Sequence, residues 1–172
     1  KLLDEREISY SLSERLENAI ILENVSFAAL PGFDEGFFFV QDEASRICTS
    51  VLGARPGDVI ADTCSAPGGK SFSAAIDGEG EAEIHSFDLH SSKLSLIEGG
   101  RDRLGLSSIT VAEQDATKPR EELIGMADRV ICDAPCSGLG VIRRKPDIKY
   151  KPQDDFKELV SVQRQILQNA AD

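Results

Sequence analysis

Residues 62–70 read Asp62-Thr63-Cys64-Ser65-Ala66-Pro67-Gly68-Gly69-Lys70, a glycine-rich segment that follows the short apolar run 59–61. The apolar run has the composition of a buried strand, and the pattern after the glycines predicts a helix over 71–76. Glycines between a strand and a helix let the main-chain N–H groups come close to a ligand. The segment therefore predicts a strand–turn–helix unit with a binding site at its turn.

Three further apolar runs, 83–88, 108–111 and 128–132, also read as strands, and a helix is predicted between the first two at 91–104. Strands that alternate with helices form parallel sheets with right-handed crossovers. We therefore expect an α/β fold with four core strands of a doubly wound, mainly parallel sheet. Other expected elements are strands at 19–22 and 37–40, and helices at 41–52, 121–126 and 153–171.

The 172 residues suffice for one domain or for part of a larger one, and we divide them at residue 37. Residues 37–172 are predicted to be the N-terminal part of a catalytic domain, whereas 1–36 are predicted to be a linker or the remnant of a small preceding subdomain.

The overall composition excludes several classes of protein. Thirty acidic against 19 basic residues give a net charge of −11, which argues against a broadly basic surface. There is no Trp and aromatic residues are 6%, so large base-stacking platforms are not expected. No apolar run approaches the roughly 20 residues that span a bilayer, and no secretion signal opens the chain. We expect a cytoplasmic protein that does not contact membranes.

The four cysteines, Cys48, Cys64, Cys132 and Cys136, are spaced neither for a disulfide scaffold nor for a zinc site, and no metal is expected. Cys48 lies on the apolar side of a helical pattern, so we expect it to be a small buried residue. Cys64 and Cys136 differ, because each lies in a Gly- and Pro-containing segment directly after a predicted strand.

Chemically suggestive residues follow all four core strands: Cys64–Lys70, Asp88, Asp115 and Asp133–Gly138. The carboxyl ends of parallel strands meet at one edge of a sheet, where such folds bind ligands. The first loop lacks the spacing of a Walker A motif and of a dinucleotide fingerprint, which disfavours a phosphate ligand. Asp88 lies 26 residues after Asp62, near the usual position of an acid that accepts ribose hydroxyls.

Asp115 lies just after the third predicted strand, where its carboxylate can accept a hydrogen bond from an adenine amino group. A ligand that has a ribose and an adenine but no phosphates is S-adenosyl-L-methionine, which is therefore the expected cofactor. The alternative, a set of ordinary turns and helix caps, stays open on spacing alone.

Four ordered motifs resemble the RNA cytosine-C5 methyltransferases of the NOP2/Sun (Fmu) family. The segment 62–71 looks like its cofactor loop, and Asp133-Ala134-Pro135-Cys136-Ser137-Gly138 looks like its Pro-Cys motif. The stretches 30–42 and 140–149 resemble the bacterial small-subunit ribosomal RNA methyltransferase B branch. The resemblance implies a Rossmann-like methyltransferase fold, S-adenosyl-L-methionine as cofactor and ribosomal RNA as partner, with neither DNA nor oligomerisation expected.

The resemblance also implies a role for each matching residue. Cys64, Ser65, Ala66, Pro67, Gly68, Gly69 and Lys70 would wrap the methionine part of the cofactor. Asp88 would hold the ribose and Asp115 the adenine, and Asp133 would lie beside both cofactor and target base. Cys136 would assist release of the product, although DNA cytosine-C5 methyltransferases use a Pro-Cys thiolate as the nucleophile, and that assignment stays open.

This sequence departs from the family because it has no Thr-Cys motif after Cys136, which in the family carries the nucleophile. We therefore expect this chain to be part of a longer protein and to be inactive alone. The fourth strand is then expected to be an open edge of the sheet, with its apolar residues Val130 and Ile131 lacking a neighbouring strand. The basic run Arg143-Arg144-Lys145 is predicted to contact RNA phosphates, the alternative being a solvated face. A non-catalytic module that binds cofactor or RNA is the alternative function, and a small-molecule methyltransferase is a weaker one.

Overall fold

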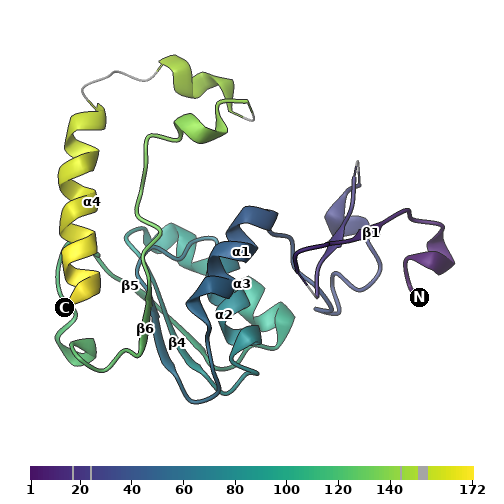
Figure 1. Cartoon of the computed structure of the whole chain (residues 1–172), viewed down its shortest axis with the longest axis horizontal. Helices are drawn as coiled ribbons and strands as arrows, with labels where there is room; N and C mark the ends of the chain where they lie inside the picture. The colour runs from purple at the N-terminus through teal and green to yellow at the C-terminus, as the bar shows by residue number, and fades with distance from the viewer. Residues whose placement is uncertain (17, 24, 144, 151–154) are drawn as a thin grey trace.

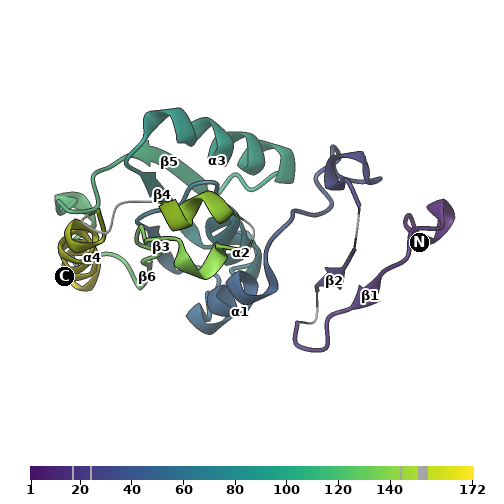
Figure 2. The same ribbon diagram turned by 90° about the horizontal axis from the view of Figure 1, so that it is seen from above.

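The computed structural model describes residues 1–172 except 17, 24, 144 and 151–154. Within the described residues, four parallel strands form the main sheet in the order β5-β4-β3-β6 (Figures 1 and 2). Their bounds are β3 Val59–Asp62, β4 Glu83–Asp88, β5 Ile109–Glu113 and β6 Arg129–Ile131. The predicted α/β class with four core strands is confirmed, and β6 is an outer strand as expected.

The helices lie close to their predicted positions: α1 Glu43–Leu52, α2 Gly69–Asp77, α3 Ser91–Leu104 and α4 Asp155–Ala171. A separate antiparallel pair, β1 Ser11–Leu12 and β2 Ile20–Ile21, lies apart from the main sheet (Figure 2). Short 3₁₀ helices are η1 Asp4–Arg6, η2 Phe27–Ala29, η3 Glu121–Leu123, η4 Leu139–Val141 and η5 Pro146–Tyr150. The helix predicted at 121–126 is therefore only the 3₁₀ turn η3. The division at residue 37 stays a prediction.

One face of the sheet carries the core, because every second residue of each strand points to the same side. Ile60 of β3 and Ile84 of β4 are fully buried there against α2 and α3, together with Ile97. Full burial of one such side chain is worth about 1.5–3 kcal/mol. The opposite face, with Ala61, Phe87 and Val130, borders a cavity of about 170 Å³ beside the end of α4.

The predicted helix 41–52 is confirmed as α1, but its buried side is not the predicted one. Asp42 caps the helix by accepting from the Ala44 N–H at 3.0 Å. Cys48 is exposed, so the prediction of a buried residue is wrong. A bidentate pair between Arg46 and Asp77 of α2 turns the helix so that Thr49 is buried instead.

The predicted strand at 37–40 is also wrong, because this segment joins no ladder. The Arg103 guanidinium donates to the carbonyl oxygens of Phe33 at 2.6 Å and Phe38 at 3.0 Å. The Phe39 ring packs edge-on against Phe72, with 5.9 Å between the ring centroids. A side-chain donor thus satisfies the backbone that a neighbouring strand would otherwise pair.

Among the described residues, none of the helices combines the length and the apolar character that crossing a membrane requires. In the same part of the chain, no group of three or more His, Cys, Asp or Glu side chains is placed to hold a metal ion.

Candidate functional site

The carboxyl ends of the four core strands meet at one edge of the sheet, as predicted. The Thr63 N–H donates to the Ile131 carbonyl of β6 at 3.0 Å, and the Ser65 N–H donates to the Phe87 carbonyl of β4 at 2.7 Å. The Gln114 N–H after β5 donates to the Asp88 carbonyl at 3.1 Å. Main-chain hydrogen bonds therefore join the loops that carry the predicted site residues.

The loop Cys64–Lys70 turns sharply into α2 at Gly68. This glycine has φ +109°, and its N–H donates to the Ser65 carbonyl at 2.7 Å. A Cβ atom at this position would lie 2.4 Å from the Phe72 Cζ atom, so a side chain does not fit. The first N–H groups of α2 lack partners within the helix, and they give this end of the site a positive partial charge.

Beneath the loop, three buried polar side chains form a hydrogen-bonded chain. The Ser86 hydroxyl of β4 donates to the Ser71 Oγ of α2 at 2.7 Å, and the Ser71 hydroxyl donates to the Asp62 Oδ2 of β3 at 2.7 Å. Burial raises the pKa of Asp62 to about 6, and the hydrogen bonds from Ser71 and from the Cys64 backbone partly oppose this. The chain fixes the start of α2 to both central strands.

The two candidate adenosine residues lie after neighbouring strands. Asp88 is nearly buried, and its carboxylate accepts from the N–H of His90 at 3.0 Å and of Ala66 at 3.3 Å. Asp115 accepts from the Thr117 hydroxyl at 2.6 Å and N–H at 3.0 Å, and this hydroxyl is the main reason why the pKa of Asp115 lies below its usual value. Both carboxylates retain lone pairs that can accept further hydrogen bonds.

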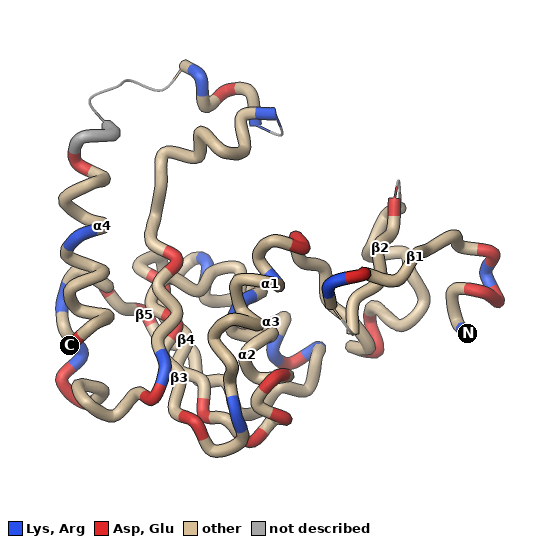
Figure 3. Tube along the Cα trace, in the orientation of Figure 1, with Lys and Arg blue, Asp and Glu red and all other residues tan. Residues whose placement is uncertain are grey.

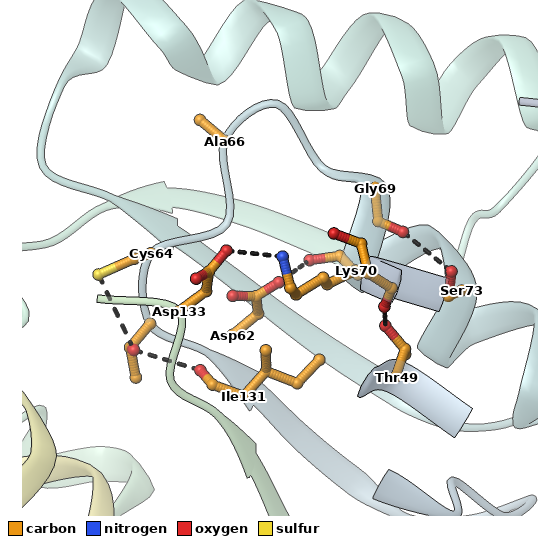
Figure 4. A network of polar contacts seen from close by, with 12 residues as sticks. Thr49, Asp62, Cys64, Ala66, Gly69, Lys70, Ser73, Ile131 and Asp133 are labelled. Carbon is orange, nitrogen blue, oxygen red and sulfur yellow. Dashed lines mark hydrogen bonds and ion pairs between the residues drawn. The ribbon is translucent and has the colours of Figure 1, made fainter. Parts of the chain in front are cut away.

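Asp133, after β6, forms an ion pair with Lys70 of α2, with 2.6 Å between Nζ and Oδ2 (Figure 4). Sequence reasoning placed both residues in the site but did not predict their pairing, because they lie 63 positions apart. The pair joins the loop after β3 to the loop after β6. It therefore links the predicted cofactor side to the predicted target-base side.

The two cysteines of the site differ in environment. Cys64 is half-buried, and burial raises the pKa of its thiol to about 11, so the thiol stays protonated at neutral pH. Cys136 is exposed in the loop that follows β6. Its loop is held by the Gln163 side-chain amide of α4, which donates to the Pro135 carbonyl at 2.8 Å. Of these two thiols, that of Cys136 is the more accessible to solvent, which suits a reactive role better than the thiol of Cys64.

These groups fit S-adenosyl-L-methionine in kind. The N-terminus of α2 offers N–H donors to a carboxylate, and Asp88 and Asp115 offer acceptors to hydroxyl and amino groups. Arg143 and Lys145 lie exposed beyond Cys136, whereas Arg144 lies outside the described residues. Figure 3 shows basic residues in that outer segment.

The comparisons with known proteins show which family this chain resembles. A family model described as "16S rRNA methyltransferase RsmB/F" matches residues 49–172. The probable ribosomal RNA small subunit methyltransferase B of Bacillus subtilis is 40% identical over 157 residues, which cover 90% of this chain and 35% of that protein. The same-named protein of Citrobacter koseri is 40% identical over 141 residues, which cover 81% of this chain and 32% of that protein. The chain thus spans about a third of these relatives.

Among solved structures, PH0851 is 31% identical with a TM-score of 0.89, and the match covers 98% of this chain and 39% of that one. NSun6 from Pyrococcus horikoshii, solved with SFG, is 29% identical with a TM-score of 0.73, and the match covers 85% and 37% of the two chains.

Proposed function

This chain belongs to the 16S rRNA methyltransferase RsmB/F family, and on that premise we propose that it forms the cofactor-binding part of an enzyme that methylates carbon 5 of a cytosine in small-subunit ribosomal RNA. The observation that carries the proposal is the Lys70–Asp133 ion pair, which joins the loop after β3 to the Pro-Cys loop. The family confirms the predicted cofactor, S-adenosyl-L-methionine. Action on ribosomal RNA implies work in the cytoplasm.

In this proposal the α2 N-terminus binds the carboxylate of the cofactor. The Asp88 carboxylate accepts hydrogen bonds from the ribose hydroxyls, and the Asp115 carboxylate accepts a hydrogen bond from the adenine amino group. When bound, S-adenosyl-L-methionine supplies an electrophilic methyl group. The Ser86–Ser71–Asp62 chain holds the loop in place, so little reorganisation is needed on binding.

The target carbon needs activation, because carbon 5 of cytosine is a weak nucleophile. A thiolate that adds to carbon 6 forms an S–C bond and pushes the electron pair of the double bond to carbon 5, which then takes the methyl group. As the thiol adds, its proton passes to ring nitrogen 3, and Asp133, oriented by Lys70, accepts a hydrogen bond from that N–H until the proton leaves again with the departing thiol. A base then removes the proton from carbon 5, and the thiolate leaves as the double bond re-forms.

Cys136 has two possible roles in this scheme. In the first, which the family resemblance implies, it assists release of the product while a thiol outside this sequence is the nucleophile. In the second, it is the nucleophile itself. Its exposure is compatible with either role.

A Cys136→Ala variant of the natural-length protein separates the roles. With a cytosine-containing ribosomal RNA segment and the cofactor, a trapped covalent protein–RNA adduct on a denaturing gel supports the release role. Loss of every adduct supports the nucleophile role. Cys48→Ala is the matched control, because Cys48 is also an exposed thiol but lies on α1.

Mass spectrometry of the RNA tests the reaction as a whole. A gain of one methyl group at carbon 5 of a cytosine is expected for the natural-length protein, whereas the 172-residue chain alone is expected to be inactive. Retained binding of S-adenosylhomocysteine without methyl transfer by the natural-length protein would instead favour the non-catalytic module.

A further inference from the structure

The segment 139–150, here called the basic arm, follows the Pro-Cys loop and extends away from the carboxyl edge of the sheet (Figure 1). It contains four basic residues and one acidic residue, Asp147, in a chain whose net charge is −11. Of the basic residues, Arg143, Lys145 and Lys149 are exposed in the described structure. The arm is therefore a local positive surface on an acidic protein, which suits a polyanionic ligand.

The arm is anchored to the Pro-Cys loop through Ile148. This side chain is only 9% exposed, and its Cδ1 atom would lie 3.0 Å from a Cβ placed on Gly138. The Lys145 N–H donates to the Val141 carbonyl at 2.9 Å, and the Ile148 N–H donates to the Lys145 carbonyl at 3.2 Å. These contacts join η4 and η5 into one unit, so the end of the arm has a defined position relative to Cys136.

At that end, Tyr150 presents its side chain to solvent with 76% of the residue exposed. The Lys149 ammonium lies 4.9 Å from the centroid of the ring. A flat aromatic ring beside a cationic side chain matches the way proteins bind single-stranded nucleic acids, in which bases stack on rings and cations contact the phosphates. The composition argues against a large stacking platform, but one ring suffices for one base.

We propose that Tyr150 stacks on an unpaired base that flanks the target nucleotide, while Lys149, Arg143 and Lys145 contact the neighbouring phosphates. This inference rests on the proposed function and adds to it a position for the RNA strand. Because Ile148 ties the arm to the Pro-Cys loop, a base held on Tyr150 would place its neighbours at a fixed distance from Cys136. The arm would then help to select unpaired over base-paired RNA, since a stacked base must be free of its duplex.

The test uses the natural-length protein and a single-stranded RNA that it methylates, with 2-aminopurine placed in turn at positions next to the cytosine. Tyr150→Ala is expected to weaken binding about 5- to 160-fold, the range for loss of one base–aromatic stack. It should also abolish the 2-aminopurine quenching at one position. Tyr150→Trp and Tyr150→Phe should retain both signals, because they retain the ring.

Salt dependence separates stacking from charge. Tyr150→Ala should leave the slope of log K against log salt unchanged, whereas Lys149→Ala should reduce its magnitude by about 0.7. Val51→Ala is the control for loss of an exposed side chain, since Val51 is 81% exposed on α1.

Unchanged affinity and unchanged quenching in Tyr150→Ala, with methyl transfer intact, would overturn the stacking proposal alone. If the unsubstituted protein neither binds nor methylates RNA, the proposed function fails first. A Tyr150→Ala variant that loses affinity but keeps the full quenching signal would also overturn the stacking proposal. The ring would then act on RNA binding through the fold of the arm and not by contact with a base.

Discussion

The loop after β3 and the loop after β6 lie side by side but are built differently. In the first, Ser65 is buried, and its N–H and hydroxyl both donate to the Phe87 carbonyl of the next strand. In the second, Cys136 is exposed, and Asp133 is held mainly by the side chain of Lys70. Main-chain bonds and buried side chains together organise the cofactor loop, whereas exposed side chains hold the Pro-Cys loop. This difference suits a small cofactor that needs a preformed site and an RNA that approaches from solvent.

Alanine substitutions at Gly68 in the cofactor loop and at Gly138 in the Pro-Cys loop should show the largest difference in stability between the two loops. Gly68→Ala meets both a φ of +109° and the Phe72 ring at 2.4 Å, and we expect a loss of about 3 kcal/mol in the free energy of unfolding. Gly138→Ala has φ +75° but its Cβ comes no nearer than 3.0 Å, to the Ile148 Cδ1 atom, so about 1–2 kcal/mol is expected.

Urea unfolding of both variants measures these losses. Gly80→Ala is the control that measures the loss of unfolding free energy from the left-handed backbone conformation alone. Its φ is +74°, and nothing lies within 4 Å of the added Cβ. Equal losses at positions 68 and 138 would contradict the proposed difference between the loops.

The buried carboxyl of Asp62 should make stability pH-dependent. Its pKa is about 6 in the folded chain against a usual 3.8, so between these values the folded state holds a proton that the unfolded state has released. The contribution of Asp62 to stability therefore falls as pH rises through this range, by on the order of 2–3 kcal/mol. The difference in unfolding free energy between the wild type and Asp62→Asn should decline from pH 4 to pH 7. A flat difference would show that Asp62 is ionised throughout.

Removing the ion pair between the loops should affect activity more than stability. Lys70→Met is expected to cost less than 1 kcal/mol of unfolding free energy, because the Asp133 side chain is 58% exposed and water already screens the pair. Methyl transfer by the natural-length protein should fall on the order of tenfold if Lys70 orients Asp133. Arg46→Met at the pair with Asp77 is the control, and it should leave kcat unchanged.

The smallest effect is expected on α1, far from both loops. Cys48→Ser should change the unfolding free energy by less than about 0.5 kcal/mol, because the thiol is exposed rather than packed in the core. A loss above about 1 kcal/mol would restore the sequence-based view that Cys48 is a buried side chain.

Most elements of the main sheet follow from the sequence, because their signals are local. The strand 83–88 and the helix 91–104 were predicted with the bounds of β4 and α3, since alternating apolar runs and a closing glycine mark them. The buried face of α1 and the segment 37–40 were not predicted correctly. There, the Arg46–Asp77 pair and the Arg103 guanidinium decide the outcome, and both act across more than thirty positions.

The sequence alone determined the α/β class, the loops at the strand ends and the family to which the chain is related, because periodicity and motifs are properties of neighbouring residues. Only the tertiary structure decided that Lys70 pairs with Asp133, that Asp62 is buried under the cofactor loop and that Tyr150 stands exposed on an anchored arm. These features arise where segments distant in the chain meet, and burial and pairing at such places depend on the packing of the whole fold.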